Sequence, residues 1–156
     1  MKIARALGME VLTYSRTAKV YEDSHIKSVS LEDLLRNSDF VSIHAPLTSE
    51  TKYLINKDRL AQMKPSAFLI NTSRGAIIKE TDLINSLKNK VIAGAALDVL
   101  EQEPPELDNP LLSMNNVILT PHIGWKCLES RQRLIKLLAI NISSFSQGSP
   151  VNIVNA

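Results

Sequence analysis

Short hydrophobic runs alternate with longer amphipathic segments along most of the chain. Runs of strand length that are apolar throughout predict buried strands, whereas longer segments with apolar residues three or four positions apart predict helices. Strands are expected at 11–14, 40–43, 67–70, 92–99 and 117–119. Helices are expected at 2–7, 31–37, 57–63, 81–88 and 128–146. Apolar strands separated by helices indicate a parallel sheet covered on both faces, which is a doubly wound α/β architecture.

Local signals support several of these boundaries. Ser30, with Asp33 three residues later, is a good N-cap for the second helix, and Asn56 can cap the third. Gly8 suits the position just past the end of the first helix. The polar stretch that follows the first strand through Lys27 predicts no regular element, and the Pro-rich, acidic segment 102–115 predicts a loop long enough to suggest a functional role.

Composition narrows the class of protein. The 156 residues are 44% hydrophobic and 22% charged, which is ordinary for one globular domain with a buried core. The net charge is only +2, and Lys and Arg are scattered, which argues against nucleic acid as a partner. No apolar run reaches the roughly 18 residues that span a bilayer, and residues 1–8 do not form a secretory signal. With one cysteine and therefore no internal disulfide, we expect a cytoplasmic protein.

Three chemically complementary residues follow three separate strands. Arg74 follows the strand at 67–70, Glu103 follows that at 92–99, and His122 follows that at 117–119. Taken singly, each has a simpler explanation: Arg74 could form a surface ion pair, Glu103 could be one acid of an acidic loop, and His122 could cap backbone groups. In open parallel sheets, however, ligands bind at the carboxyl ends of the strands. We therefore expect the three side chains to converge on one site.

Four strings around these residues resemble a known family. They are VSIHAPLT at 41–48, NTSRG at 71–75, ALDVLEQEP at 96–104 and TPHIG at 120–124. In order and spacing they are similar to the motifs of the D-isomer-specific 2-hydroxyacid dehydrogenases, and the resemblance covers essentially the whole chain. The run HIGWK at 122–126, followed by ESRQRL at 129–134, is most similar to the glyoxylate and hydroxypyruvate reductase (glycerate dehydrogenase) branch.

The resemblance implies a hydride exchange between C4 of a nicotinamide and the carbon of a 2-oxo acid, which gives a D-2-hydroxy acid. Arg74 would hold the substrate carboxylate in a bidentate fork and polarise the 2-oxo group. His122 would donate a proton to the carbonyl oxygen, and Glu103 would orient the imidazole and stabilise its charged form. Trp125 would line the mouth of the substrate site, although packing against the next helix explains it equally well.

The resemblance also implies a groove for a nicotinamide dinucleotide, and no metal. Asp98 would contact the nicotinamide amide, although capping of nearby backbone explains it as well. No carboxylate follows the first strand before Glu22, which slightly favours NADP over NAD. Arg16 could contact the 2′-phosphate, or could simply be a solvated surface residue. The residues implied to line the groove are Ser15, Arg16, His44, Ala45, Pro46, Thr51, Thr72, Ser73, Asp98 and Gly124.

One motif of the family is missing. No G-x-G-x-x-G string occurs among the five glycines of the chain. In the family this loop follows the first strand and opens a helix, whose tail we identify at 2–7. We therefore expect a Rossmann-like domain over 1–147 that lacks its first strand and glycine-rich loop, and a tail, 148–156, that returns to a missing substrate domain. Because that strand is central, its loss should split the sheet and leave two unpaired edges, which we expect a homo-oligomer to cover.

Three functions stay open at this point. The first is a truncated dehydrogenase for small 2-oxo acids of the glyoxylate and hydroxypyruvate type, weakly active or inactive alone. The second is a cofactor-sensing or protein-interaction module on a dehydrogenase scaffold, against which the presence of Arg74, Glu103 and His122 argues. The third is a phosphoglycerate dehydrogenase, which the Trp125-Lys126 pair disfavours. Substrate identity does not follow from the chain, because specificity in the family lies largely in the substrate domain.

Overall fold

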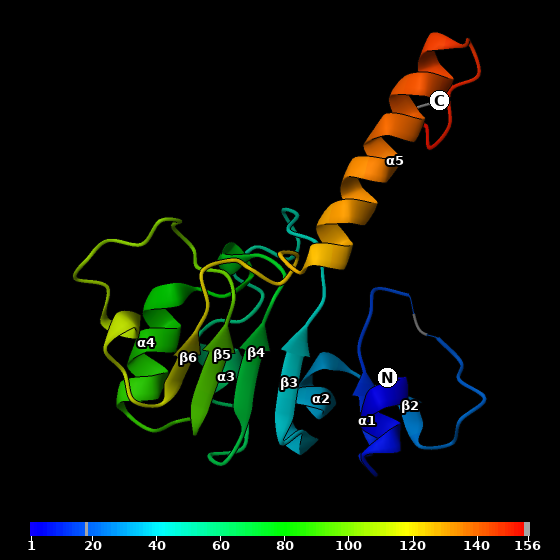
Figure 1. The fold of residues 1–156 in the computed structure, drawn as a ribbon. Helices are drawn as coiled ribbons and strands as arrows, with labels where there is room; N and C mark the ends of the chain where they lie inside the picture. The colour runs from blue at the N-terminus through cyan, green and yellow to red at the C-terminus, as the bar shows by residue number, and fades with distance from the viewer. Residues whose placement is uncertain (18, 155–156) are drawn as a thin grey trace. The chain divides into compact units, whose positions relative to one another are not determined.

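The computed structural model describes residues 1–17 and 19–154, which form two compact units, Met1–Pro121 and a second that begins at His122 (Figure 1). The strands of the first unit are β1 (Val11–Thr13), β2 (Ile26–Ser28), β3 (Phe40–Ile43), β4 (Phe68–Asn71), β5 (Gly94–Leu97) and β6 (Val117–Leu119). Its helices are α1 (Lys2–Ala6), α2 (Leu31–Asn37), α3 (Lys57–Leu60) and α4 (Glu80–Lys88), with 3-10 turns η1 (Gly75–Ile77) and η2 (Pro110–Leu112). The second unit contains α5 (Leu128–Ser146). The predicted α/β class is confirmed.

The described strands form two separate parallel sheets. One pairs β1 with β2, and the other has the order β3-β4-β5-β6. Every pairing is parallel, as the apolar strands separated by helices predict. The prediction of a split sheet is therefore confirmed. Within the described residues β3 is hydrogen-bonded to a strand on one side only, and its other edge is unpaired.

Local signals place several elements where they were expected. Ser30 Oγ accepts a hydrogen bond from the Asp33 amide at the start of α2, and Asn56 Oδ1 accepts one from the Arg59 amide at the start of α3. Gly8 follows α1 with φ of +78°, a conformation that glycine adopts readily. The expectation of no regular element through Lys27 is wrong, because β2 forms there. Its sequence is barely apolar, and it is ordered by pairing with β1.

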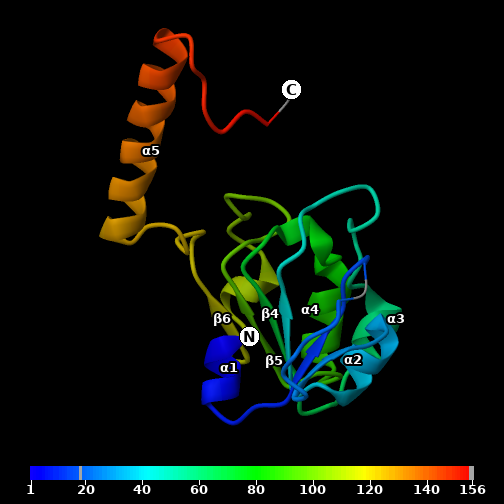
Figure 2. The same cartoon turned by 90° about the vertical axis from the view of Figure 1, so that its right-hand side faces the viewer.

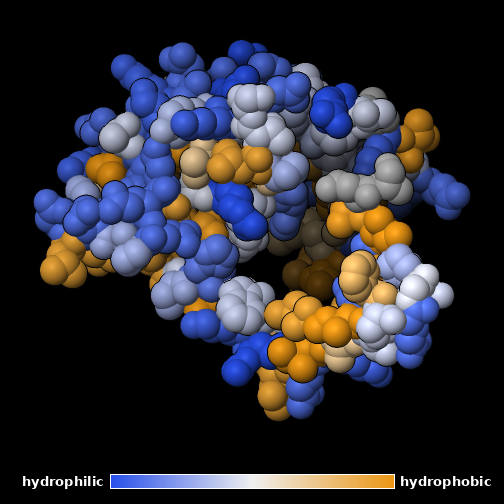
Figure 3. Space-filling model, turned by 90° about the horizontal axis from the view of Figure 1, so that it is seen from above, coloured by the Kyte–Doolittle hydropathy of each residue, from blue (hydrophilic) through white to orange (hydrophobic). Residues whose placement is uncertain are grey.

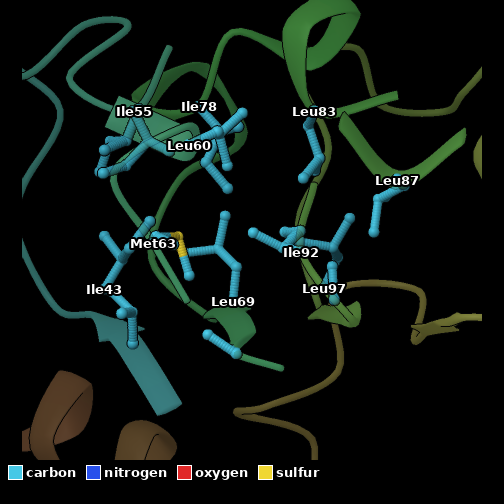
Figure 4. Close-up of a cluster of buried hydrophobic side chains, with 14 of the residues drawn as sticks. Ile43, Ile55, Leu60, Met63, Leu69, Ile78, Leu83, Leu87, Ile92 and Leu97 are labelled. Carbon is cyan, nitrogen blue, oxygen red and sulfur yellow. The ribbon is translucent and has the colours of Figure 1, made fainter. Parts of the chain in front are cut away.

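Helices α2, α3 and α4 cover one face of the four-stranded sheet (Figure 2). Between them lies the hydrophobic core, in which side chains of the helices meet those of the strands (Figure 4). Leu35 of α2, Leu60 of α3 and Leu69 of β4 are completely buried. Burial of a side chain of this size contributes about 1.5–3 kcal/mol, so this layer is what holds the strand ends in place.

We expected helices to cover both faces of this sheet, but the other face is exposed. Phe40, Phe68 and Ile118 project from it and are 57%, 42% and 70% exposed. The rings of Phe40 and Phe68 stack with their centroids 5.9 Å apart. At Gly94 a Cβ would lie 2.8 Å from the Phe68 ring, so glycine makes room for the aromatic pair. The helices of the first unit that pack on the core are all on the opposite face.

The second unit consists of a turn, α5 and a tail. Helix α5 has no buried residue, and Leu134, Leu138, Ile142 and Phe145 are each more than half exposed. Asn152 Nδ2 donates to Asn141 Oδ1 at 2.9 Å, which ties the tail back to the helix. The predicted boundary between 147 and 148 stays a prediction. Neither α5 nor any other helix within residues 1–17 and 19–154 is long and apolar enough to cross a membrane.

Candidate active site

The loop that carries Arg74 is fixed by the buried Asn71 at the end of β4. Asn71 Oδ1 accepts a hydrogen bond from the Ser73 amide at 3.0 Å, and Nδ2 donates to the Arg74 carbonyl at 2.9 Å. Ser73 Oγ donates to the carbonyl of Ile43, the last residue of β3, at 2.9 Å. The loop is thus held from two strands. We expected Asn71 only as part of a motif, and its role as an organiser was missed.

The Arg74 side chain lies exposed at this rim. Its Nη1 donates to the Ser73 carbonyl at 2.7 Å. A guanidinium has five N–H donors in a planar fork, so this contact orients the group without using up its capacity to hold an anion.

Gly75 brings the Arg74 loop against the loop that follows β5. A Cβ at Gly75 would lie 1.8 Å from the Leu100 carbonyl oxygen, so only glycine permits this approach of two backbones. On the other side of the contact, Glu103 Oε1 accepts a hydrogen bond from the Leu100 amide at 2.9 Å. The structure therefore brings together the segments that carry Arg74 and Glu103, as the strand order predicted.

The carboxyl ends of β5 and β6 are joined by Asp98. The residue is only 8% exposed, and its Oδ1 accepts a hydrogen bond from Thr120 Oγ1 at 2.5 Å. The Thr120 amide donates to the Leu97 carbonyl at 2.9 Å. This contact gives Asp98 a structural role, and its expected contact with a nicotinamide stays a prediction.

A hollow of about 460 Å³ lies at the ends of β3 and β4. It is lined by His44, Ala45, Pro46, Leu47, Ser73 and Arg74. His44 Nε2 is hydrogen-bonded to Ser42 Oγ at 2.9 Å. Thr51 Oγ1 donates to the Pro46 carbonyl at 2.6 Å, which closes the loop that forms one wall. Thr72 lies exposed in the chain beside Ser73. Most residues predicted for the cofactor groove on these two strands thus do line one concave surface.

Ser15 and Arg16 follow β1, as expected, and both are exposed. Ser15 Oγ donates to the Thr17 carbonyl at 2.6 Å. The Arg16 side chain is 89% exposed, and its Nη1 lies 3.9 Å from Glu50 Oε2. An ion pair this exposed is weak, so the guanidinium is accessible to a ligand.

His122, Gly124 and Trp125 belong to the second unit. His122 has φ of +51°, a left-handed conformation uncommon for a residue other than glycine. Such conformations cluster at functional sites, where the surrounding structure maintains them. Trp125 is 51% exposed, and the Lys126 amide donates to the Ile123 carbonyl at 2.9 Å, which closes the turn before α5. Among residues 1–17 and 19–154, no three His, Cys, Asp or Glu side chains gather as a metal site would require.

Comparison with known proteins agrees with this arrangement. The family profile described as "D-isomer specific 2-hydroxyacid dehydrogenase, NAD binding domain" matches residues 1–124. A hydroxypyruvate reductase of Blautia hydrogenotrophica is 44% identical over 99% of this chain and 48% of its own length. A glyoxylate reductase of Thermococcus litoralis is 45% identical over 99% of this chain and 47% of its own. The chain thus spans about half the length of these relatives.

A solved structure shares the fold as well. It is a D-isomer specific 2-hydroxyacid dehydrogenase from Lactobacillus delbrueckii ssp. bulgaricus in an NAD-complexed form. It superimposes with a TM-score of 0.91 at 30% identity, over 99% of this chain and 51% of the other.

Proposed function

Since this chain belongs to the D-isomer specific 2-hydroxyacid dehydrogenase family, we propose that it is the cofactor-binding part of an oxidoreductase. The reaction is the transfer of a hydride between NAD(P)H and a small 2-oxo acid of the glyoxylate or hydroxypyruvate type, which gives a D-2-hydroxy acid. The names of the relatives support this substrate class.

The observation that carries the proposal is the contact between the loops that follow β4 and β5. Gly75 and Leu100 touch through their backbones, which sets Arg74 on one side of the contact and Glu103, bonded to the Leu100 amide, on the other. We propose that His122, which follows Thr120 by two residues in the sequence, adds an imidazole to this cation and carboxylate.

The residues at this rim suit a nicotinamide dinucleotide. The hollow beside His44, Pro46 and Ser73 lies at the carboxyl ends of two parallel strands, where open α/β sheets bind their ligands. The nicotinamide, when bound, supplies or accepts the hydride. Asp98 would hold the nicotinamide carboxamide. Arg74 would position the substrate, and His122 with Glu103 would transfer the proton.

Arg74 would bind the carboxylate of the 2-oxo acid through two parallel N–H donors. A planar fork fixes both the position and the tilt of the acid, which a lysine ammonium would not do. The rest of the guanidinium would polarise the 2-oxo oxygen, where negative charge develops as the carbon accepts a hydride.

His122 would donate its imidazolium proton to that oxygen, so the product leaves as a neutral alcohol and the histidine becomes neutral. In the reverse direction it accepts the same proton. Glu103 would accept the second imidazole N–H, which selects the reactive tautomer and favours the protonated ring. The strained backbone of His122 supports this role, because such strain is tolerated where it serves a site.

We further propose that the chain alone turns over weakly. It contains no G-x-G-x-x-G loop, so the pyrophosphate lacks the backbone donors and helix N-terminus that usually bind it. NADP is slightly favoured over NAD, because Arg16, and no carboxylate, follows β1 at the rim. Trp125 would line the substrate site.

We also propose that the partner is a second copy of the chain. The apolar residues Leu134, Leu138, Ile142 and Phe145 fall on one stripe of α5 and are all exposed. Hydrophobic residues reach the surface on the side of the molecule seen in Figure 3. Contiguous apolar surface on a protein of this size marks an interaction site.

Reduction of glyoxylate and hydroxypyruvate, followed by the loss of nicotinamide absorbance, tests the proposed activity. We expect slow turnover that His122→Asn reduces by a factor of about 10²–10⁴, which is what general acid catalysis contributes. The matched control is His25→Asn, because His25 is an exposed histidine hydrogen-bonded to Glu10 and has no proposed role in the reaction. Equal rates for the wild type and His122→Asn would refute the mechanism.

Calorimetry with NADH and NADPH completes the test. We expect Arg16→Ala to weaken NADPH binding about tenfold and NADH binding little, since a phosphate contact of about 1.4 kcal/mol corresponds to that factor. Tight cofactor binding by a wild type that shows no turnover would favour a cofactor-sensing module instead.

A further inference from the structure

Two glutamates outside the proposed catalytic set exchange hydrogen bonds across the loop contact. The Glu80 amide donates to Glu101 Oε2 at 3.2 Å, and the Glu101 amide donates to Glu80 Oε2 at 3.0 Å. Glu80 is the first residue of α4, and Glu101 lies in the loop after β5. No side chain at the N-cap, Lys79, caps α4, so Glu101 takes that role from 21 residues away.

The exchange is extended at both ends. Tyr53 donates its hydroxyl to Glu101 Oε1, and the Tyr53 amide donates to the Ala76 carbonyl at 2.8 Å, within η1. The hydrogen bond to Glu101 raises the pKa of the Tyr53 phenol. At the other end, Asn109 Nδ2 donates to Glu80 Oε1 at 2.7 Å. Each carboxylate oxygen of the two glutamates therefore accepts a hydrogen bond from a defined partner.

The position of this network relates it to the proposed chemistry. The segment from Arg74 to Glu80 is joined to the segment from Leu100 to Glu103 at two points. One is the backbone contact of Gly75 with Leu100, and the other is the exchange between Glu80 and Glu101. Two attachments prevent one segment from pivoting about the other, whereas one would not.

We infer that Glu80, Glu101 and Tyr53 form a brace that sets the spacing between Arg74 and Glu103, and that the two glutamates are positioning residues for the reaction. The inference rests on the proposed function, because only that function requires a defined distance between the guanidinium and the carboxylate. A displacement of about 1 Å in a reacting geometry can cost a factor of about 10² in rate.

Electrostatics makes the brace cooperative. Two carboxylates that face each other repel, and here the backbone amides and the positive N-terminal end of α4 offset that repulsion. Truncation of one glutamate side chain removes one of the two hydrogen bonds of the exchange and leaves the other bond to join the segments alone. The effects of the two substitutions should therefore not add.

The test uses Glu101→Ala, Glu101→Gln and Glu80→Ala, with Asp82→Ala as the matched control. Asp82 is also an α4 carboxylate that accepts a backbone hydrogen bond, but from the Lys57 amide at 2.9 Å and away from the loop. The primary readouts are the carboxyl ¹³C shift of Glu103 and the ¹⁵Nε shift of Arg74, which need no turnover. The absorbance titration of Tyr53, with Tyr14 and Tyr21 in the same spectrum, reports whether the brace is open.

We expect both alanine substitutions in the brace to move the Glu103 and Arg74 resonances, and Glu101→Ala to lower the pKa of Tyr53 toward its ordinary value. Glu101→Gln keeps an acceptor for the Glu80 amide and should lie between the wild type and Glu101→Ala. In turnover, we expect kcat to fall by about 10- to 100-fold with KM within about twofold, the signature of lost positioning. Asp82→Ala should leave the resonances and kcat near those of the wild type.

The inference is overturned if Glu101→Ala and Glu101→Gln leave the Glu103 and Arg74 resonances unchanged, or if Asp82→Ala moves them as far. Failure of the proposed function is a different result, namely a wild type without turnover or a His122→Asn variant with full turnover. In either of those cases the resonances still decide whether the brace sets the two side chains.

Discussion

Asn71, at the end of β4, uses both ends of its amide to shape the Arg74 loop. It is completely buried and satisfies the Ser73 amide and the Arg74 carbonyl. An unpaired backbone group in that position would cost about 1–3 kcal/mol, so the side chain contributes to stability and to the direction of Arg74 at once. Gly75, four residues after Asn71, also shapes the loop, because the absence of a side chain lets its backbone contact that of Leu100.

Gly75→Ala is the sharpest single substitution at this site. The added Cβ would collide with the Leu100 carbonyl, and we expect it to destabilise the fold by about 1–3 kcal/mol, as overpacking does, and to displace the loop that carries Glu103. Thermal unfolding measures the first effect, and the amide resonances of Leu100 and Glu101 measure the second.

Gly8→Ala separates this clash from a backbone effect. Gly8 has φ of +78°, but a Cβ there would meet nothing within 4 Å. This variant should lose stability through its left-handed conformation alone and leave the Leu100 and Glu101 resonances in place. Equal displacement of those resonances in both variants would show that the contact of Gly75 with Leu100 does not hold the loop.

The approach of the two loops was more predictable than the contacts that hold them. Arg74 and Glu103 each follow an apolar strand, and parallel strands end at one edge of a sheet, so the approach of the segments that carry them could be predicted. The pairing of Glu101 with Glu80 could not, because it joins residues 21 positions apart that carry no periodic pattern. Glycine at 75 was the only nearby signal of a close backbone approach. The predicted roles of the site residues stay predictions.

Elements whose signals are local were predicted well, and elements that depend on distant partners were not. Helix α2 was predicted with both ends correct, because Ser30 caps it from the adjacent position. Helix α4 was expected to open at Thr81 or a neighbouring residue and begins at Glu80, so its start was predicted. Its cap by the distant Glu101 was not. Strand β2 was missed because Ile26, Lys27 and Ser28 have little β character without the pairing to β1.

The elements α1, β1 and β2 should loosen in acid. Asp23 accepts hydrogen bonds from the His25 amide at 2.9 Å and from Arg5 Nε at 3.2 Å, and these lower its pKa. Glu10 is hydrogen-bonded to His25, which lowers its pKa as well. A lowered pKa means that the stabilisation is present above the unfolded-state value and is lost as the pH falls through the folded-state value.

Amide protection measures this effect element by element. Below about pH 4, near the ordinary carboxyl values, we expect protection of the Val11 and Ile26 amides to fall before that of β4 and β5. In Asp23→Asn most of this pH dependence should be gone, with protection already low near neutral pH. Simultaneous loss of protection in both sheets would contradict this prediction.

On the scale of the whole molecule, the consequential feature is the division of the sheet. The chain has no G-x-G-x-x-G string, and its described strands form two sheets in place of one. The split could be predicted because the usual strand order of this fold places a further strand between these two sheets. The exposure of the sheet face with Phe40, Phe68 and Ile118 could not be predicted. A run of apolar residues such as that at 40–43 does not show which face of the sheet the helices will cover. The cytoplasmic location stays a prediction.

The proposed second copy predicts a concentration-dependent mass. Light scattering should find a species of at least twice the mass of the chain, and Leu138→Glu in the exposed stripe of α5 should shift it to the monomer, because a buried unpaired carboxylate is costly. Lys136→Glu, on the same helix but at a polar position, is the control. A wild-type chain that is monomeric at every concentration would contradict the proposal that two copies of the chain associate.

A crystal structure with NADPH and oxamate would show whether Arg74, Glu103 and His122 act on one 2-oxo acid. Oxamate resembles a 2-oxo acid but is not reduced. We expect the Arg74 guanidinium on its carboxylate, His122 on its 2-oxo oxygen and Glu103 on the far imidazole nitrogen, each within about 3.2 Å. If, in every copy, the His122 ring lies more than about 10 Å from the Arg74 guanidinium, no small ligand can be shared and the proposed mechanism is wrong.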